Sequence, residues 1–374
     1  MLFTIEELLT IAKEKKASDV HVTVGLPPRI RINGELVDLD YPKMTPADCE
    51  ELILSIMDER QKELFKDRGE LDFSFSSPNV GRYRVNVFRQ RGSVACAMRV
   101  VGTVIPKPES LGVPKSVIEL YAKKRGLVLV TGPTGSGKST TLYAALSQLA
   151  EKKINCVTVE DPVEKLINGV TQVQVNAKAG LTFATALRSI LRQDPDVIMV
   201  GEIRDEETAD IGVRAAVTGH LVLSTLHTND CVSAVYRLQN MGIPFYMIAA
   251  ATTGVVAQRL VKVLCPHCRR KIKAGQQTKR LLYEVSGKEA EEVWEAVGCE
   301  ECLNTGYSHR RAIYEMFELN ETTKNMIRDG ETAEKIRRYQ RERGFLSLQE
   351  QAAQMVMNGE MDMEEAEKVI YSAD

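Results

Sequence analysis

The residues with the clearest chemistry form a short glycine-rich loop. The loop has the spacing Gly-x-x-x-x-Gly-Lys-Ser, follows an apolar run at 127–131 and precedes a helical pattern that starts at Lys138. In such a loop, glycines let backbone N–H groups turn inward around phosphate oxygens, and the helix N-terminus adds its positive end. Strand, loop and helix in this order predict a P-loop, and the alternative is an ordinary glycine-rich turn. The expected phosphate-binding residues are Gly132, Pro133, Thr134, Gly135, Ser136, Gly137, Lys138, Ser139 and Thr140.

Two of these residues indicate which molecules the loop would hold. A lysine at the place of Lys138 reaches the β- and γ-phosphates of a nucleotide, and a serine hydroxyl at the next position, Ser139, binds Mg²⁺. The sequence therefore predicts ATP and Mg²⁺ as cofactors and nucleotide hydrolysis as the reaction.

Three polar clusters follow later apolar runs, at the strand ends where an open α/β sheet holds its ligands. Carboxylates there could bind Mg²⁺ through water or orient the attacking water, and a histidine could sense the γ-phosphate. Gly201 stands where many P-loop proteins have Asp, so the next residue is expected to take that role. Each cluster alone could be a helix cap or a surface acid, but their order behind the P-loop favours catalysis. The expected catalytic residues are Glu160, Glu164, Glu202 and His227.

Two pairs of cysteines, each with two residues between its members, flank the segment 269–298. This spacing predicts one tetrahedral Zn²⁺ site, because each pair can grip the ion from a tight turn. Disulfides and packed thiols are the alternatives, and a reducing cytoplasmic setting argues against disulfides. Four protein ligands leave no open position, so the site is expected to be structural. The expected ligands are Cys265, Cys268, Cys299 and Cys302.

Length, composition and charge place these sites in a globular protein of two or three domains. The chain has 374 residues, 44% of them hydrophobic, and a formal net charge of −2, so no global field favours nucleic acid or an acidic membrane. The start of the sequence lacks the features of a signal peptide, and no apolar run approaches the roughly 18 residues of a membrane span. The remaining cysteines stand alone in apolar or helical contexts, as in a reduced cytoplasmic protein. They are Cys49, Cys96, Cys156 and Cys231.

The elements that must position these residues divide the chain into two expected domains. Strands and short helices over 1–101 predict a small α+β domain, and the Pro- and Gly-rich stretch 102–114 predicts a linker. Residues 115–374 alternate strand and helix patterns, which predicts a parallel sheet covered on both faces. This second domain is expected to include the zinc-binding segment 262–305, in a charged and helical part of the chain, and a helical tail at 331–374. The expected strands of its sheet are 127–131, 154–160, 197–200 and 221–226.

With these motifs placed, the sequence resembles the secretion ATPase superfamily, specifically the hexameric motors of type II secretion and type IV pili. The resemblance covers nearly the whole chain, and its motifs are specific in combination. Beside the P-loop, the family's Asp box, Walker B region, His box and N-terminal PAS-like domain have counterparts. These counterparts lie at 157–164, 187–205, 218–230 and, for the PAS-like domain, 17–21 and 29–34.

The resemblance implies a fold and an activity. The implied fold class is α/β, with a RecA-like P-loop ATPase domain, a smaller N-terminal PAS-like α+β domain and a C-terminal helical tail. The implied activity is ATP hydrolysis by a cytoplasmic homohexamer, peripheral at the inner face of the cytoplasmic membrane. The hexamer would move an inner-membrane platform protein and would meet the membrane only through that partner, with no direct contact to nucleic acid.

Three arginines of the N-terminal domain gain a role only from this resemblance. A period of 2 over 82–87 puts Arg82 and Arg84 on one strand face, and from the residues alone a solvated face is the favoured interpretation. In the family, this domain supplies arginines to the ATP phosphates, where positive charge stabilises the transferring phosphoryl group. The resemblance makes Arg82, Arg84 and Arg99 the candidates, with domain closure gating the chemistry.

The features of the chain divide between two kinds of motor. The four-cysteine site and the stretches 200–205 and 254–260 resemble assembly or secretion motors. The short N-terminal region resembles a retraction motor, whereas the stretch 322–329 is only a degenerate version of a retraction motif. Assembly or secretion is therefore the favoured function, and pilus retraction is the alternative. The near-neutral charge disfavours a nucleic-acid translocase, and the filled acidic positions disfavour a nucleotide-binding regulator without turnover.

Overall fold

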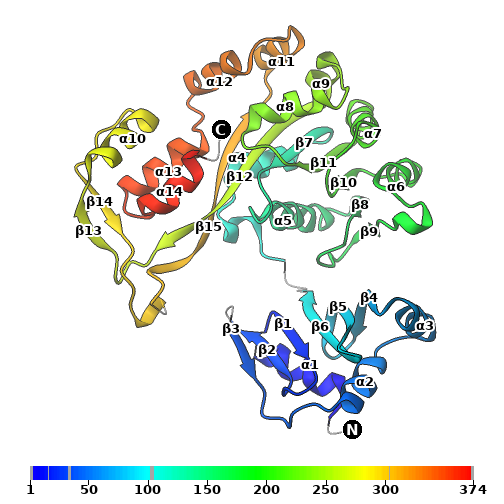
Figure 1. Ribbon diagram of the computed structural model, residues 1–374. Coiled ribbons are helices and arrows are strands. Elements are labelled where there is room, and N and C mark those ends of the chain that lie inside the picture. Colours follow the sequence, from blue (N-terminus) through cyan, green and yellow to red (C-terminus); the bar gives the residue numbers. More distant parts are fainter. Residues whose placement is uncertain (1–2, 16, 33–34, 102–104, 303, 372–374) are drawn as a thin grey trace. The chain divides into compact units, whose positions relative to one another are not determined.

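The computed structural model (Figure 1) describes residues 3–15, 17–32, 35–101, 105–302 and 304–371. The chain divides into two compact units, of which the first comprises residues 1–104 and 164–166 and the second comprises the remainder. The expected linker begins with residues 102–104, which lie outside the described residues. Its later part contains a short 3-10 helix at Pro108–Leu111.

The first unit is built on a six-stranded antiparallel sheet with helices on one face. Its strands are β1 (Asp19–Val22), β2 (Arg29–Ile32), β3 (Glu35–Asp38), β4 (Glu70–Ser77), β5 (Gly81–Gln90) and β6 (Ser93–Val101), in the order β3-β2-β1-β6-β5-β4. Along β5, Tyr83, Val85 and Val87 are buried, whereas Arg84 between them is exposed. This alternation confirms the predicted period of 2. The apolar face packs against α1 (Ile5–Glu14), α2 (Pro46–Leu54) and α3 (Glu59–Arg68).

A seven-stranded sheet forms the centre of the second unit. Its strands are β7 (Gly126–Thr131), β8 (Cys156–Glu160), β9 (Val170–Gln174), β10 (Val197–Val200), β11 (Leu221–Leu226), β12 (Thr252–Leu264) and β15 (Tyr307–Glu318). Their order is β15-β12-β7-β11-β10-β8-β9, and every neighbouring pair is parallel except β12 with β15. The four strands expected from the sequence are therefore present, and they lie side by side with β9 and β12 as neighbours.

Helices cover both faces of this sheet, as a largely parallel sheet requires. Along β7, Leu127 and Leu129 belong to one apolar core, Val128 and Val130 belong to another, and all four side chains are buried. The face of Val128 and Val130 packs against α4 (Lys115–Tyr121) and α5 (Lys138–Ala150). The opposite face packs against α6 (Phe183–Ile190), α7 (Glu206–Val217), α8 (Cys231–Asn240) and α9 (Phe245–Ala251).

The structure corrects the expectation for the chain beyond residue 262. The sequence predicts a charged and helical region there, but β12 continues to Leu264 and β15 returns antiparallel beside it, as the long pair in Figure 1 shows. Between them in sequence lies a hairpin of β13 (Arg270–Lys273) and β14 (Glu292–Glu295), connected by α10 (Gln276–Ser286). The sequence did not reveal β12, because a strand inside a sheet lacks the alternation of apolar and polar residues that marks a half-exposed strand. The antiparallel β15 also corrects the expectation of an entirely parallel sheet.

The chain after β15 is helical and agrees with the expected C-terminal tail. It forms α11 (Glu321–Arg328), α12 (Ala333–Glu342), α13 (Leu348–Met357) and α14 (Met363–Ile370). α13 contacts α10, and both α13 and α14 contact β14 (Figure 1), so the tail packs against the segment between the two cysteine pairs. In the described part of the chain, no helix is both long and apolar enough to cross a membrane.

Candidate nucleotide site and metal centre

The glycine-rich loop connects β7 to α5 and ends at a helix start without a cap. Gly137, the residue before α5, has a φ of 89° and contributes no side-chain cap. The first N–H groups of α5 are therefore available to an anion. The Lys138 Nζ donates to the carbonyl oxygens of Gly132, at 2.8 Å, and Pro133, at 3.0 Å. A phosphate would offer this ammonium a charged and therefore stronger acceptor.

Glu202 and His227 meet at the carboxyl ends of neighbouring parallel strands. Glu202 follows β10, His227 follows β11, and the His227 Nε2 lies 3.6 Å from the Glu202 Oε2. The Glu202 side chain is 15% exposed, and Arg204 forms an ion pair with its other oxygen. The fold thus brings together two of the residues that the sequence nominates for catalysis.

The loop that carries His227 is tied to the strand that leads into the P-loop. Thr131, the last residue of β7, donates its hydroxyl to the Thr228 carbonyl oxygen at 2.6 Å and accepts the Thr228 N–H at 3.1 Å. These two bonds join the ends of β7 and β11, which are adjacent in the sheet. His227 and the P-loop are therefore held at one edge of the same unit.

Burial lowers the pKa of two basic groups at this edge of the sheet. Burial lowers the pKa of Lys138, Glu202 opposes that shift, and the neighbouring charge of Arg259 adds to it. Burial also lowers the pKa of His227, followed in size by the repulsion from Lys138. Both effects favour the neutral form of the His227 ring. A bound polyphosphate would favour the charged forms of both groups, because it brings negative charge to them.

Glu160 and Glu164 occupy different settings. Glu160 ends β8 and is 4% exposed, and its carboxylate accepts hydrogen bonds from the Thr158 Oγ1 at 2.5 Å, from the Gln172 Nε2 at 3.0 Å and from the Tyr143 hydroxyl. Glu164 lies in the loop after β8 and is exposed. Three interior side chains hold Glu160, and the part that either glutamate plays in hydrolysis stays a prediction.

The three candidate arginines share the open face of the sheet in the first unit. Arg84 on β5 lies directly opposite Arg99 on β6, and Arg82 is two residues before Arg84 on the same strand. The Arg84 Nη2 lies 3.5 Å from the Asp72 Oδ2, and the Arg99 Nε lies 2.9 Å from the Asp19 Oδ1. The Arg84 and Arg99 side chains are 56% and 75% exposed, so this basic face is open. Delivery of these arginines to the P-loop stays a prediction.

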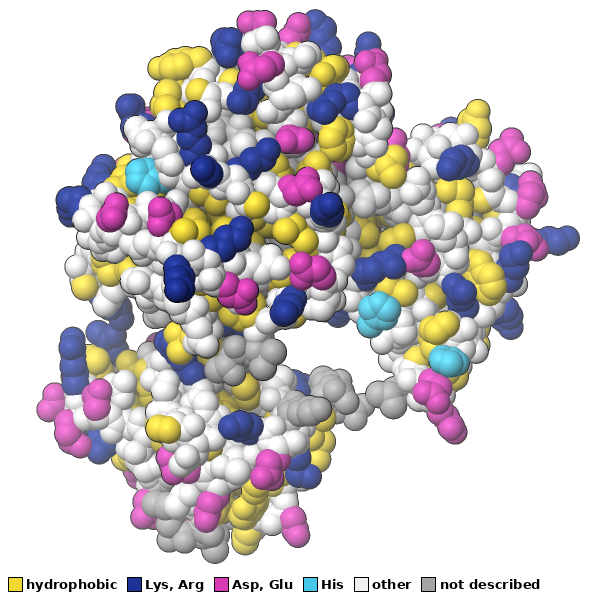
Figure 2. Space-filling model, turned by 180° about the vertical axis from the view of Figure 1, so that it is seen from behind, with side chains coloured by type: hydrophobic (Ala, Val, Ile, Leu, Met, Phe, Trp, Pro, Cys, Tyr) yellow, Lys and Arg dark blue, Asp and Glu magenta, His cyan; other side chains and the backbone are white. Residues whose placement is uncertain are grey.

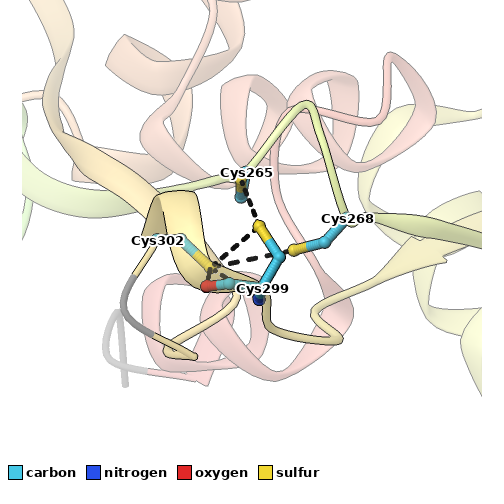
Figure 3. Close-up of side chains that lie close together, drawn as sticks. All are labelled: Cys265, Cys268, Cys299 and Cys302. Atoms are coloured by element: carbon cyan, nitrogen blue, oxygen red, sulfur yellow. Dashed lines mark hydrogen bonds between the residues drawn. The ribbon is translucent and has the colours of Figure 1, made fainter.

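The four paired cysteines converge in the second unit, where Figure 3 shows their side chains pointing toward one another. All four Sγ atoms lie within 4.8 Å of one another, with separations of 3.9 Å for Cys265–Cys299, 3.8 Å for Cys268–Cys302 and 3.7 Å for Cys299–Cys302. Sulfurs about 2.3 Å from one tetrahedral ion are about 3.8 Å apart, whereas a disulfide brings them to about 2.05 Å. The predicted cluster is confirmed, and its spacing fits zinc.

Backbone N–H groups point at these sulfurs, as thiolate ligands require. Gly298 donates to the Cys268 Sγ at 3.3 Å, and Cys299 and Gly306 each donate to the Cys302 Sγ at 3.2 Å. Burial opposes ionisation of Cys302, but these two donors and the neighbouring thiols of Cys299 and Cys268 lower its pKa to about 6, while the pKa of Cys299 is raised to about 11. Because the thiolate is the form that binds metal, the donor set of the site also fits Zn²⁺.

Two polar side chains of the second unit have no counterpart in the sequence-based expectations. Gln258 on β12 is 1% exposed, and its amide bonds to the P-loop and to α5. Glu315 on β15 accepts the first N–H groups of two helices, from Cys231 at 2.9 Å and from Leu348 at 3.3 Å. The sequence gives no signal for either residue, because β12 also carries Arg259 and Lys262 and β15 carries several further polar residues.

Comparisons with known proteins give one consistent result. A family model described as "Type II/IV secretion system protein" matches residues 3–368. The type II secretion system protein HxcR of Pseudomonas aeruginosa is 39% identical over 387 residues, which cover 99% of this chain and 77% of the relative. The type IV pilus assembly ATPase PilB of Thermus thermophilus is 45% identical over 269 residues, 70% of this chain and 30% of that protein. The crystal structure of the pilus retraction motor PilT with bound ADP has a TM-score of 0.79 and 34% identity, and covers 98% of this chain and 97% of that chain.

Proposed function

Because the chain belongs to the family of type II/IV secretion system proteins, we propose that it is a motor ATPase that couples ATP hydrolysis to type II secretion or type IV pilus assembly. The match to the family model confirms the resemblance to secretion ATPases that the sequence showed. The similarity to the PilT structure confirms the expected fold class. One observation carries the proposal. The Glu202–His227 pair lies at the same sheet edge as the P-loop, near enough for Lys138 to act on the pKa of His227.

The proposal gives each residue of this edge a task. The P-loop N–H groups and Lys138 would bind the phosphates, and Ser139 would hold Mg²⁺, which offsets phosphate charge when bound. Glu202 would orient the attacking water and accept its proton. His227 beside it would donate a hydrogen bond to the γ-phosphate. Glu160 and Glu164 would support the metal or the water from the loop after β8.

The same proposal covers the three arginines, the ring of subunits and the membrane partner. Arg82, Arg84 and Arg99 would bring positive charge to the phosphates when the nucleotide site closes. A closed ring of six copies needs a heterologous interface, in which one surface of a subunit meets a different surface of the next. The ring would work at the inner face of the cytoplasmic membrane on an inner-membrane platform protein and would meet the membrane through that partner.

We also propose that the four-cysteine cluster holds one structural Zn²⁺. The support is the set of sulfur separations and the N–H groups that favour thiolates. When bound, the ion would cross-link the end of β12 to the start of β15. All four ligands come from the protein, so no position is left for a substrate.

The test of the motor function is Mg²⁺-dependent ATP binding and hydrolysis by the full chain. Lys138→Ala should abolish nucleotide binding, whereas Lys123→Ala, at a lysine paired with Glu318 at 3.5 Å, should behave as wild type. A wild-type chain that binds no ATP in the presence of Mg²⁺ would contradict the proposal. Turnover that needs DNA or RNA would favour a nucleic-acid translocase instead. On the face in Figure 2, however, basic and acidic side chains are intermixed rather than gathered in a basic strip.

Pilus retraction is the second candidate, and the likeness to the PilT structure favours it. The two candidates differ in the phenotype of a cell that lacks this protein. Loss of an assembly or secretion motor should leave the cell without surface pili or without secreted substrate. Loss of a retraction motor should leave the cell with excess pili that do not retract.

A further inference from the structure

We propose that Gln258 on β12 is a positioning residue that holds the P-loop in its phosphate-binding shape. The inference rests on the proposed ATPase function and adds a residue to its site. Gln258 is 1% exposed and lies on the strand beside β7, from which the loop emerges. In sequence it is 122 residues away from its partner in the loop. The glycine-rich motif therefore does not contain the residue that makes this contact with it.

Both ends of the Gln258 amide are engaged by the site. The Nε2 donates to the carbonyl oxygen of Ser136 in the loop at 2.8 Å, and the Oε1 accepts the hydroxyl of Thr141, in the first turn of α5, at 2.9 Å. An amide has one donor end and one acceptor end, and a carbonyl oxygen can only accept. The Ser136 bond therefore fixes which end faces the loop, and the Thr141 hydroxyl, which can donate or accept, donates to the Oε1. In the opposite orientation, the Oε1 would face the Ser136 carbonyl oxygen and repel it.

The bond to Ser136 also sets the direction of the next N–H group. In a planar trans peptide, the C=O of one residue and the N–H of the next point in opposite directions. Because the Ser136 carbonyl is turned toward Gln258, the Gly137 N–H points away from Gln258. A phosphate must approach from that side, since Gln258 fills the other. P-loops bind phosphate through backbone N–H groups with this kind of orientation.

The loop lies so close to Gln258 that a side chain could not fit between them. A Cβ at Gly137 would lie 2.8 Å from the Gln258 Nε2, and a Cβ at Gly132 would lie 2.4 Å from the Gln258 carbonyl oxygen. The φ angles of these glycines are 89° and 145°. The Gln258 side chain therefore supplies a spatial reason for Gly137, and the backbone at position 258 supplies one for Gly132, beyond the conformational freedom that glycine gives.

The experiment applies the same substitution to two buried glutamines. Gln258→Met keeps the side-chain length and removes both hydrogen bonds. Gln340 on α12 is 6% exposed, and its two amide atoms have no hydrogen-bond partner in the described part of the chain, so Gln340→Met is the matched control. The affinity for ATP, KM and kcat are measured for both variants and for the wild-type full chain with Mg²⁺.

We expect Gln258→Met to raise the Kd and the KM for ATP about tenfold and to change kcat less than about twofold, because a donor that holds a bound phosphate acts in the ground state and the transition state alike. Gln340→Met should leave both constants unchanged. Thr141→Val removes only the hydrogen bond at the Oε1 end of the Gln258 amide and should raise KM by a smaller factor. If Gln258→Met does not fold, the KM of Thr141→Val tests the positioning role instead.

The outcomes separate this inference from the function on which it rests. Wild-type affinity in Gln258→Met, or an equal loss in Gln340→Met, would overturn the positioning role while the ATPase stands. A wild-type chain that binds no ATP would overturn the proposed function and the inference together. A KM effect confined to Gln258 and Thr141, in variants that unfold at the same denaturant concentration as the wild type, would establish the role, because general destabilisation is then excluded.

Discussion

Arg84 on β5 and Arg99 on β6 lie directly opposite each other on the open face of the antiparallel sheet. Like charges in this arrangement repel. Two carboxylates offset part of the repulsion. Asp72 lies 3.5 Å from Arg84, and Asp19 lies 2.9 Å from Arg99. A bound polyanion would offset it further, so the pair is suited to an anionic ligand.

Single replacements of these arginines by Ala are expected to lower kcat by about tenfold or more and to weaken ATP binding less, because their charge matters most in the transition state. The measurements are ATP affinity and turnover for Arg82→Ala, Arg84→Ala and Arg99→Ala. Arg89→Ala is the control, since Arg89 lies on the same strand but over the Phe65 ring. If all three variants hydrolyse ATP at the wild-type rate, the first unit is not a catalytic partner.

Glu202→Gln should separate nucleotide binding from hydrolysis. The amide keeps the size of the side chain but cannot accept a proton from water, so kcat should fall by roughly 10²–10⁴ while ATP affinity is retained. Glu321→Gln, at a side chain that is 86% exposed, is the control and should turn over normally. Wild-type turnover in Glu202→Gln would remove Glu202 from catalysis.

Metal analysis of freshly reduced full-length protein should find one Zn²⁺ per chain. Cys302→Ser should lose the ion, whereas Cys49→Ala, at a buried cysteine of the first unit, should retain it. Structural zinc sites contribute roughly 10–16 kcal/mol of apparent binding free energy in small peptides, so chelation should loosen the segment 262–305 first. Hydrogen exchange would report that loosening. Far less than one equivalent of zinc in the reduced wild type would count against the site.

Glu315→Gln should destabilise the second unit. Glu315 accepts the N–H groups of Cys231 and Leu348 with its two oxygens, and glutamine offers only one oxygen, so one of these N–H groups would lose its partner. The expected loss in the free energy of unfolding is about 1–3 kcal/mol. Glu318→Gln on the same strand removes an exposed ion pair with Lys123 and should cost less than about 1 kcal/mol. Denaturant unfolding of the two variants compares them, and equal losses would refute the bridging role.

The titration of His227 should respond to both charged neighbours. Burial and then Lys138 lower its pKa, and Glu202 raises it. The neutral ring is favoured in the native state, so its contribution to stability is present above the usual pKa of 6.5 and is lost as the pH falls through the lowered value. NMR titration should give a midpoint below 6.5 in the wild type, a higher one in Lys138→Met and a lower one in Glu202→Gln. Identical midpoints would mean that neither charge reaches the ring.

The sequence by itself determined the parts of the sites that are local in the chain. The P-loop motif follows from a strand, a loop and a helix start within residues 127–141, so adjacent residues suffice to recognise it. Each cysteine pair is also local, and tetrahedral coordination needs no more than two such pairs to meet. The alternation of Tyr83 and Arg84 predicted which face of β5 is buried, because side chains along a strand alternate between its faces.

Only the tertiary structure decided which distant residues support these local motifs. Gln258 reaches Ser136 across 122 residues, and Glu315 reaches Cys231 across 84, because β12 and β15 are added to the sheet on the far side of β7. Periodicity cannot reveal such contacts. It reports whether a residue is buried and on which face, whereas the neighbour of a buried residue depends on strand order, which long-range pairing sets. Candidate residues for the chemistry could thus be predicted from the sequence, whereas the contacts of Gln258 and Glu315 could not.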